Sequence, residues 1–362
     1  MSEGRNRETL HLRGARSFVQ GRFESVARED FDDGWTPEEK PQGELKTQVA
    51  IERARSIVSH NDSPDVGFDR SINPYRGCEH GCVYCYARPS HSYLELSPGL
   101  DFETKLFAKT NAAALLRETL ARPGYAPQPV ALGANTDCYQ PIERKYRVTR
   151  QILEVLADCE HPVTLITKSA LVERDLDILG PMAKKNLVKV FVSIGTLDRE
   201  LARKLEPRAA SPQRRLDVLR ALSKDQIPCG VMVAALIPAL SDKTLEQVLE
   251  AAAAAGAREA GYITLRLPHE LKDVFKEWLA AHYPQRAEHV ISILRQVRGG
   301  RDNDPRFGTR MTGTGNYAEL IERRFELACR KYGLNGHGGA RPRAELDCSR
   351  FRPPRGGQMT LF

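Results

Sequence analysis

Short apolar runs alternate with stretches of helical periodicity through the central part of the chain. Runs of this length, flanked by turn residues, are typical of strands that are covered on both faces of a sheet. Strands separated by helices favour a parallel arrangement, because each return to the same edge requires a crossover. The sequence therefore predicts an α/β fold with strands at residues 66–72, 129–134, 162–167, 187–195, 228–237 and 260–266.

Helical periodicity fills the intervals between these runs, at residues 102–121, 148–159, 174–186, 211–226 and 241–257. Ser211 can cap the fourth of these helices, with Pro212 in its first turn. The pattern predicts six βα-type units, and their simplest arrangement is a partial, open (β/α)6 barrel. Functional groups of such folds gather at the carboxyl ends of the strands.

The pattern changes on both sides of this core. Residues 1–60 are polar and rich in turn residues, which predicts a largely irregular N-terminal arm, with a short helix or an extended lead-in at 47–58. A disordered tail and a substrate-contacting arm are both compatible with this composition. Residues 61–267 form the predicted core, 268–340 a mainly helical C-terminal extension, and 341–362 a flexible tail.

The charge adds a preference for polyanions. The 362 residues carry a formal net charge of +7, which favours partners such as nucleic acid. Hydrophobic residues make up 41% of the chain and charged residues 28%, as in ordinary globular proteins. There is no apolar run of about eighteen residues, and the first residues lack the apolar core of a secretory signal. We therefore expect a cytoplasmic protein without a membrane segment.

Three of the eight cysteines stand in one short stretch with the spacing C-x-x-x-C-x-x-C: Cys78, Cys82 and Cys85. Gly77 and Gly81 precede the first two and suit a loop that turns the thiols toward one point. Structural zinc usually takes four ligands in paired knuckles, and no second knuckle exists. Reduced thiols are expected in the cytoplasm, which disfavours a disulfide. An iron–sulfur cluster remains, with three buried structural cysteines as the alternative.

The stretch SINPYRGCEHGCVYCYARP resembles the signature of the radical S-adenosylmethionine (SAM) enzymes, and the chain from about Asn61 to Arg310 resembles the branch related to spore photoproduct lyase. The resemblance implies a six-unit barrel in which the three cysteines bind a 4Fe–4S cluster and SAM chelates the fourth iron. It also implies reductive cleavage of SAM to a 5′-deoxyadenosyl radical, which takes a hydrogen atom from the substrate. An electron donor such as flavodoxin or ferredoxin is implied as well.

The resemblance extends to residues around SAM, most of them at the predicted strand ends. Asn135 and Thr136 would lie near the amino group of SAM, although both could instead cap their loop by local hydrogen bonds. Lys168 would contact the carboxylate, with a surface lysine as the alternative. The full set implied to contact SAM is Tyr84, Asn135, Thr136, Lys168, Ser193 and Ala234.

Cys138 directly follows this second strand-end segment. Photoproduct lyases use a nearby cysteine to return a hydrogen atom to a product radical, which implies the same role for Cys138. The family's cysteine falls about four positions earlier, where this chain has Ala134. A buried, idle thiol is the alternative.

Two C-terminal features indicate DNA. Residues 295–310 contain five arginines, two aspartates and Phe307, a composition that suits phosphate contacts and base stacking but also a solvated loop. Gln358–Phe362, QMTLF, resembles the peptide by which bacterial DNA-processing proteins dock on the replication sliding clamp. The alternative is that Leu361 and Phe362 fold back on the protein.

The leading hypothesis is therefore a radical SAM enzyme, lyase-like or hydrogen-abstracting, that acts on nucleic acid in a DNA-repair-like reaction. One alternative is a radical SAM enzyme that modifies tRNA, a peptide or a small metabolite, which predicts SAM cleavage without dependence on DNA. Another is a non-catalytic, DNA-associated iron–sulfur binding module, which predicts a cluster without SAM cleavage.

Overall fold

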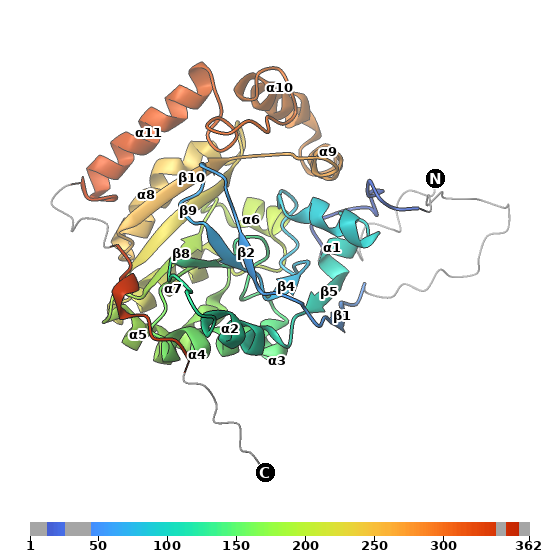
Figure 1. The fold of residues 1–362 in the computed structure, drawn as a ribbon. Helices are drawn as coiled ribbons and strands as arrows, with labels where there is room; N and C mark the ends of the chain where they lie inside the picture. The colour runs from blue at the N-terminus through green and yellow to red at the C-terminus, as the bar shows by residue number, and fades with distance from the viewer. Residues whose placement is uncertain (1–12, 26–44, 338–344, 355–362) are drawn as a thin grey trace, which may run out of the picture.

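The computed structural model describes residues 13–25, 45–337 and 345–354. Its central element is a seven-stranded sheet in the order β10-β9-β8-β7-β6-β3-β2, of which all but β2 (Val58–His60) run parallel (Figure 1). Among the described strands, β10 and β2 do not pair, so the predicted partial barrel is open. The parallel strands are β3 (Arg70–Ile72), β6 (Val130–Leu132), β7 (Val163–Thr167), β8 (Val188–Ser193), β9 (Cys229–Leu236) and β10 (Glu259–Thr264).

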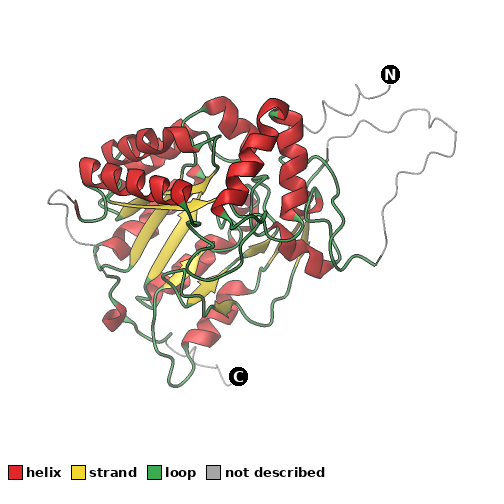
Figure 2. Ribbon diagram, turned by 90° about the horizontal axis from the view of Figure 1, so that it is seen from above, coloured by secondary structure: helices red, strands yellow, loops and turns green. Residues whose placement is uncertain are grey.

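Helices flank the strands, as Figure 2 shows. Ser211 accepts a hydrogen bond from the Arg214 amide at 3.3 Å and caps α7, as its position predicts. The side chains of Ile152 and Leu156, one turn apart on α4, are fully buried against the sheet. The helices of the core are α2 (Ala112–Leu120), α3 (Glu143–Tyr146), α4 (Val148–Asp158), α5 (Leu176–Ala183), α6 (Arg199–Leu205), α7 (Pro212–Lys224) and α8 (Leu245–Ala254), with 3₁₀ turns η2 (Arg88–Leu94), η3 (Ala170–Asp175) and η4 (Asp242–Thr244).

A second, three-stranded sheet beside the core differs from the sequence prediction. The single helix expected at 102–121 is divided into α1 (Asp101–Thr104), β5 (Lys105–Ala108) and α2. β5 pairs in parallel with β1 (Gln48–Ile51) and antiparallel with β4 (Tyr75–Arg76). These partners are distant in sequence, so local periodicity could not reveal them. The lead-in at 47–58 is accordingly extended at β1, one of its two predicted forms.

Three further helices follow the core: α9 (Leu271–His282), α10 (Ala287–Val297), joined by the turn η5 (Pro284–Arg286), and α11 (Asn316–Tyr332). Phe275 and Trp278 of α9 stack with ring centres 5.7 Å apart, in a second apolar cluster that also contains Val83 and Leu201. α11 packs along α8 (Figure 1). Within the described ranges, every helix is too short or too polar to cross a membrane.

Residues 345–354 pack on the core, where the sequence predicts a flexible tether. The Phe351 ring lies 5.3 Å from Tyr125 and 5.5 Å from His161, and the Arg352 amide donates to the Cys159 carbonyl at 2.8 Å. The short turn η7 (Cys348–Arg350) precedes Phe351. Because β7 begins directly after His161, this segment lies at the amino ends of the strands. The predicted clamp peptide, Gln358–Phe362, is outside the described residues.

Candidate functional site

The loop between β4 and η2, residues 77–87, carries the three clustered cysteines and is called the cluster loop below. Gly77 and Gly81 adopt φ angles of +71° and +67°. A Cβ atom on Gly77 would lie 2.6 Å from Leu106 Cδ2, and one on Gly81 would lie 2.6 Å from Glu103 Oε2. Both positions therefore require glycine for conformation and for space.

The three thiols are free and close enough to interact. Cys78 and Cys82 are each 6% exposed, and Cys85 is half-buried. Burial raises the pKa of the Cys78 thiol, and the charges of Asp137 and of the other two cysteines raise it further. Within the described residues, no group of three ligating side chains could hold a single metal ion. Cysteine thiolates are the usual ligands of iron–sulfur clusters, so the three thiols present on this loop fit such a group.

A buried ion pair supports the cluster loop from behind. The Arg88 guanidinium is fully buried and lies 2.5 Å from the Glu103 carboxylate. It also donates hydrogen bonds to the carbonyls of Gly81 at 3.2 Å and Cys82 at 2.9 Å. Two carbonyls at 98–99 accept further bonds from it. This role of Arg88 was not predictable from the sequence, because only its distant partners distinguish it from a surface arginine.

Asp137 joins the cluster loop to the end of β7. Its carboxylate accepts hydrogen bonds from the Lys168 amide and the Thr167 hydroxyl, both at 2.7 Å, and lies 3.3 Å from His80 Nδ1. Burial alone would raise the pKa of Asp137, but His80 and these donors outweigh it and hold the pKa below its usual range. Asp137 is therefore an ionised, buried carboxylate between two loops at the strand ends.

A second buried network surrounds Tyr84. The Tyr84 hydroxyl donates to Glu206, which also pairs with the buried Arg215. The Lys168 ammonium lies 5.9 Å from the centre of the Tyr84 ring. Burial opposes the charge of Lys168, but the negative charges of Cys82, Glu206 and Asp137 raise its pKa. Lys168 is thus a cation at the carboxyl end of β7, beside the cluster loop.

Glu206 and Arg208 are two residues apart in the segment that follows α6 but do not pair with each other. Arg208 instead forms an ion pair with Glu79, at 2.7 Å, and Glu206 forms one with Arg215. The Arg208 amide also donates to the His80 carbonyl at 3.3 Å. This segment therefore serves as a wall of the cluster loop.

Thr136 and Asn135 lie just after β6 and hydrogen-bond to the segment that follows β3. The Thr136 hydroxyl donates to the Tyr75 carbonyl at 2.9 Å, and the Asn135 amide donates to Asn73 Oδ1 at 2.8 Å. Both partners are about 60 residues away in sequence, so these bonds tie the segment after β6 to the segment after β3 and are not local caps of their own loop. Contact of either residue with SAM stays a prediction.

Ser193 and Ala234 occupy the next two strands of the sheet. Ser193 ends β8 and is buried, and its carbonyl accepts a hydrogen bond from Arg215 at 2.9 Å. Ala234 lies near the end of β9, opposite Ile263 of β10. β6, β7, β8 and β9 are neighbours in the sheet, so the predicted SAM residues on them share one edge. Their contact with SAM is likewise still a prediction.

Cys138 lies after β6 and is part of the main hydrophobic core. Its sulfur is fully buried, 3.9 Å from the Leu132 carbonyl and 4.0 Å from the Ile166 carbonyl, and burial raises the pKa of the thiol well above its usual value. This is the environment expected for the buried, idle thiol. The role of hydrogen donor stays a prediction.

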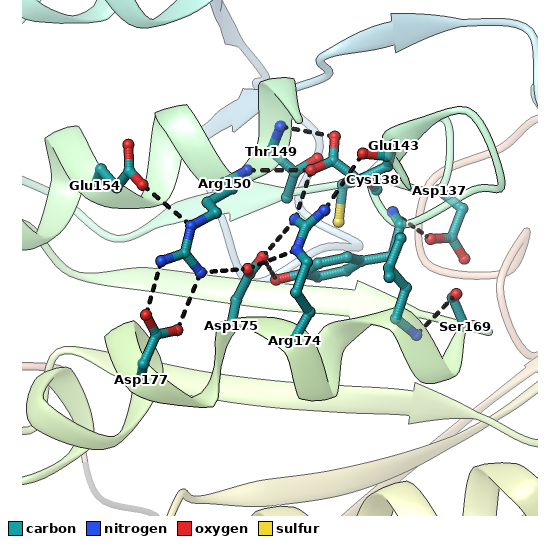
Figure 3. A network of polar contacts seen from close by, with 12 residues as sticks. Asp137, Cys138, Glu143, Thr149, Arg150, Glu154, Ser169, Arg174, Asp175 and Asp177 are labelled. Carbon is teal, nitrogen blue, oxygen red and sulfur yellow. Dashed lines mark hydrogen bonds and ion pairs between the residues drawn. The ribbon is translucent and has the colours of Figure 1, made fainter. Parts of the chain in front are cut away.

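Two fully buried carboxylates, Glu143 and Asp175, fix the connections around Cys138 (Figure 3). Arg174 lies 2.7 Å from Glu143 and 2.8 Å from Asp175, and Arg150 lies 2.8 Å from Asp175. Figure 3 shows Asp175 between the two guanidinium groups. The network ties the segment after β6 to the segment after β7, so both strand-end connections are held in one geometry.

An open, parallel α/β barrel with three clustered thiols at the carboxyl ends of its strands defines a class of iron–sulfur enzyme. The model of the Radical SAM superfamily matches residues 72–252. The chain belongs to the radical SAM superfamily.

Relatives and solved structures agree with this assignment. An uncharacterized protein of Mycobacterium tuberculosis is 38% identical over 282 residues, which cover 77% of this chain and 79% of the relative. An uncharacterized protein of Methanocaldococcus jannaschii is 25% identical over 247 residues, 68% of this chain and 88% of the relative. Spore photoproduct lyase complexed with dinucleoside spore photoproduct has a similar fold, with a TM-score of 0.57, 16% identity and coverage of 80% of this chain and 82% of that one.

Membership implies a 4Fe–4S cluster and SAM as cofactors, and a solved mutant of spore photoproduct lyase has AdoMet bound. When bound and reduced, this pair supplies a 5′-deoxyadenosyl radical. Cys78, Cys82 and Cys85 would hold the cluster, and the cation of Lys168 is placed to attract a carboxylate. The walls of the loop bury Cys78 and Cys82 and leave Cys85 half-buried.

Proposed function

We propose that the protein is a radical SAM enzyme that acts on DNA in a repair-like reaction, with flavodoxin or ferredoxin as the cytoplasmic electron donor. The observation that carries the proposal is a loop at the edge of the site, residues 299–315, called the rim loop. Its Phe307 side chain is 57% exposed, and the Arg310 guanidinium lies 4.4 Å from the ring centre. An exposed aromatic ring with arginine beside it suits base stacking and phosphate binding.

The rim loop is close to the cluster loop. Arg310 pairs with Asp65, and both interact electrostatically with Arg266 at the end of β10. Burial and the positive charge of Arg310 lower the pKa of Arg266, whereas Tyr86 and Asp65 oppose the shift. Tyr86 directly follows the last clustered cysteine. A polyanion bound at the rim loop would therefore lie next to the site of radical formation.

The rim loop is also rigidly held, unlike a loop that is merely solvated. The buried Arg298 donates hydrogen bonds to the carbonyls of Thr309 and Arg310, at 3.3 and 2.8 Å. Asp304, also buried, accepts bonds from the Arg306 guanidinium and the Thr309 hydroxyl, each at 2.9 Å. The backbone is fixed while Phe307 stays exposed, an arrangement that favours binding. The dinucleoside photoproduct named for the neighbouring lyase points to the same substrate class.

The test is anaerobic turnover of the reconstituted protein with dithionite and SAM, followed by chromatography of 5′-deoxyadenosine. We expect DNA to accelerate its formation, and Phe307→Ala to weaken DNA binding by about 1–3 kcal/mol, the value of one stacked base. Leu327→Ala, which truncates an equally exposed apolar residue on α11, is the matched control.

The outcomes separate the alternatives. Stimulation by tRNA, a peptide or a small metabolite, and not by DNA, would refute the proposed substrate. A cluster that never cleaves SAM would favour the non-catalytic binding module. Equal DNA affinity of wild type and Phe307→Ala would show that Phe307 of the rim loop does not contribute to DNA binding.

For Gln358–Phe362 we propose docking on the replication sliding clamp. The anchoring of Phe351 at the amino ends of the strands supports it, because a tail that starts there is remote from the candidate active site. Deletion of these five residues should abolish binding to the immobilised clamp and leave 5′-deoxyadenosine formation unchanged. Clamp binding that survives the deletion would refute the proposal.

A further inference from the structure

The N-terminal segment at residues 13–25, called the docked arm, lies directly against the cluster loop. A Cβ atom on Gly14 would be 1.7 Å from the Gly81 carbonyl oxygen, so no side chain fits there. Ala15 is fully buried and packs in the same apolar cluster as Cys82, Val83 and Tyr84. The arm therefore lies against residues 81–83, the part of the loop that contains the middle cysteine.

The docked arm also completes the buried ion pair behind the loop. The amides of Gly14 and Ala15 donate to the two carboxylate oxygens of Glu103, at 2.9 and 2.7 Å. The same carboxylate binds Arg88, which holds the Gly81 and Cys82 carbonyls. The arm is thus connected to the backbone of the cluster loop through two buried charged side chains.

A second set of contacts holds the arm from the other side. The Ser17 carbonyl accepts a hydrogen bond from the Leu100 amide at 3.1 Å, and the Val19 carbonyl accepts one from the Ser97 hydroxyl at 2.6 Å. A Cβ atom on Gly99 would lie 2.2 Å from the Ser17 oxygen. Close packing therefore extends along the arm, away from the cysteines.

We propose that the docked arm is the closing element of the cluster site, and that Arg88 is its positioning residue. The arm shields Cys82 from solvent, while Glu103 and Arg88 transmit its position to the loop that presents the thiols. The proposal rests on the 4Fe–4S cofactor of the family. It assigns to a segment without regular structure a role in holding iron.

The test uses Gly14→Val in the full chain, reconstituted anaerobically. The valine must lift the arm, which removes two hydrogen bonds to a buried carboxylate. We therefore expect a ferrous chelator to withdraw iron at least about tenfold faster than from wild type. We also expect a changed electron paramagnetic resonance (EPR) spectrum of the reduced cluster with SAM. Gly67→Val is the matched control, since no atom lies within 4 Å of its Cβ position, and it should behave as wild type.

Further variants keep the test decisive. Gly99→Val should reproduce the effect from the opposite side of the arm, and circular dichroism should show wild-type helix content for both. Arg88→Gln should change the EPR spectrum of the reduced cluster. Arg88→Lys, which keeps the positive charge, should give a spectrum closer to that of wild type. Wild-type chelation and EPR in both glycine variants would refute the proposal. Failure of the wild type itself to bind iron would instead refute the cluster assignment.

Discussion

The surroundings of the cluster loop and the rim loop are both rich in arginine, but the arginine side chains are buried in the first region and more exposed in the second. Behind the cluster loop, Arg88 and Arg215 are buried, and each is bound to a buried glutamate and to backbone carbonyls. On the rim loop, the Arg306 side chain is 67% exposed, and Phe307 faces solvent. Arg306 also has a buried carboxylate partner, Asp304, but most of its side chain faces solvent and is accessible to a ligand, whereas the buried guanidinium groups can only set geometry. The region behind the cluster loop thus positions the loop backbone, whereas the rim loop is suited to contact with a ligand.

The largest effect should come from the thiols themselves. Cys82→Ser should lower iron content and 5′-deoxyadenosine formation by at least about 100-fold, because loss of a ligand exceeds the loss of an outer partner. Cys348→Ser, a half-buried cysteine outside the cluster loop, is the control. Iron analysis and chromatography measure both. Full iron content in the Cys82 variant would refute the cluster assignment.

Next should come the buried pairs. Glu206→Ala leaves Arg215 buried without its carboxylate partner, which should cost about 3–5 kcal/mol of the free energy of unfolding. Denaturant titration of the metal-free protein measures it. A loss below about 1 kcal/mol would mean that this pair is solvated, and the contrast between the two regions would fail.

A buried neutral group should give a smaller, pH-dependent effect. Burial lowers the pKa of His161 to about 4, and Tyr125 and the Pro162 carbonyl contact its two nitrogens. The unfolded chain, with the usual pKa near 6.5, then binds more protons between pH 6.5 and 4. Stability is complete above this range and falls as the pH decreases, by up to about 3 kcal/mol.

Comparison of denaturant midpoints at pH 7 and pH 4.5 measures this effect. His161→Gln should reduce the difference without abolishing it, because burial also lowers the pKa of His91 to about 4, and the exposed His289→Gln should leave it unchanged. An unchanged pH dependence in the His161 variant would locate its source elsewhere.

The smallest effect should come from an exposed ion pair remote from both loops. Arg117 and Asp158 lie 2.9 Å apart, with about half of each side chain exposed. Asp158→Ala should change the free energy of unfolding by less than about 1 kcal/mol. A larger loss would show that exposure is a poor guide to the value of a charge in this protein.

The core of the fold was predictable from sequence because its signals are local. Six apolar runs and the cap at Ser211 mark elements that follow one another along the chain. β5 was not predictable, because its strand conformation depends on pairing with β1 and β4. Tertiary pairing there overrides a helical pattern.

The candidate site divides in the same way. The cysteine spacing and the strand-end position of Lys168 are visible in the sequence. The buried partners are not, because Tyr84 and Glu206 are 122 residues apart, and Gly14 and Glu103 are 89 apart. A single arginine or glycine gives no sign of such a partner until the chain is folded.

The anchoring of Phe351 has a consequence for how the protein would search its substrate. Six residues separate Phe351 from Gln358, and the seven steps between these two residues span at most about 25 Å. A short tether of this kind gives a high effective concentration of the enzyme at the partner that binds its C-terminal peptide. Because the tether starts at the amino ends of the strands, a bound enzyme molecule would keep the opposite, carboxyl ends, where the candidate site lies, turned away from the clamp. Tethering would then bias orientation as well as encounter frequency.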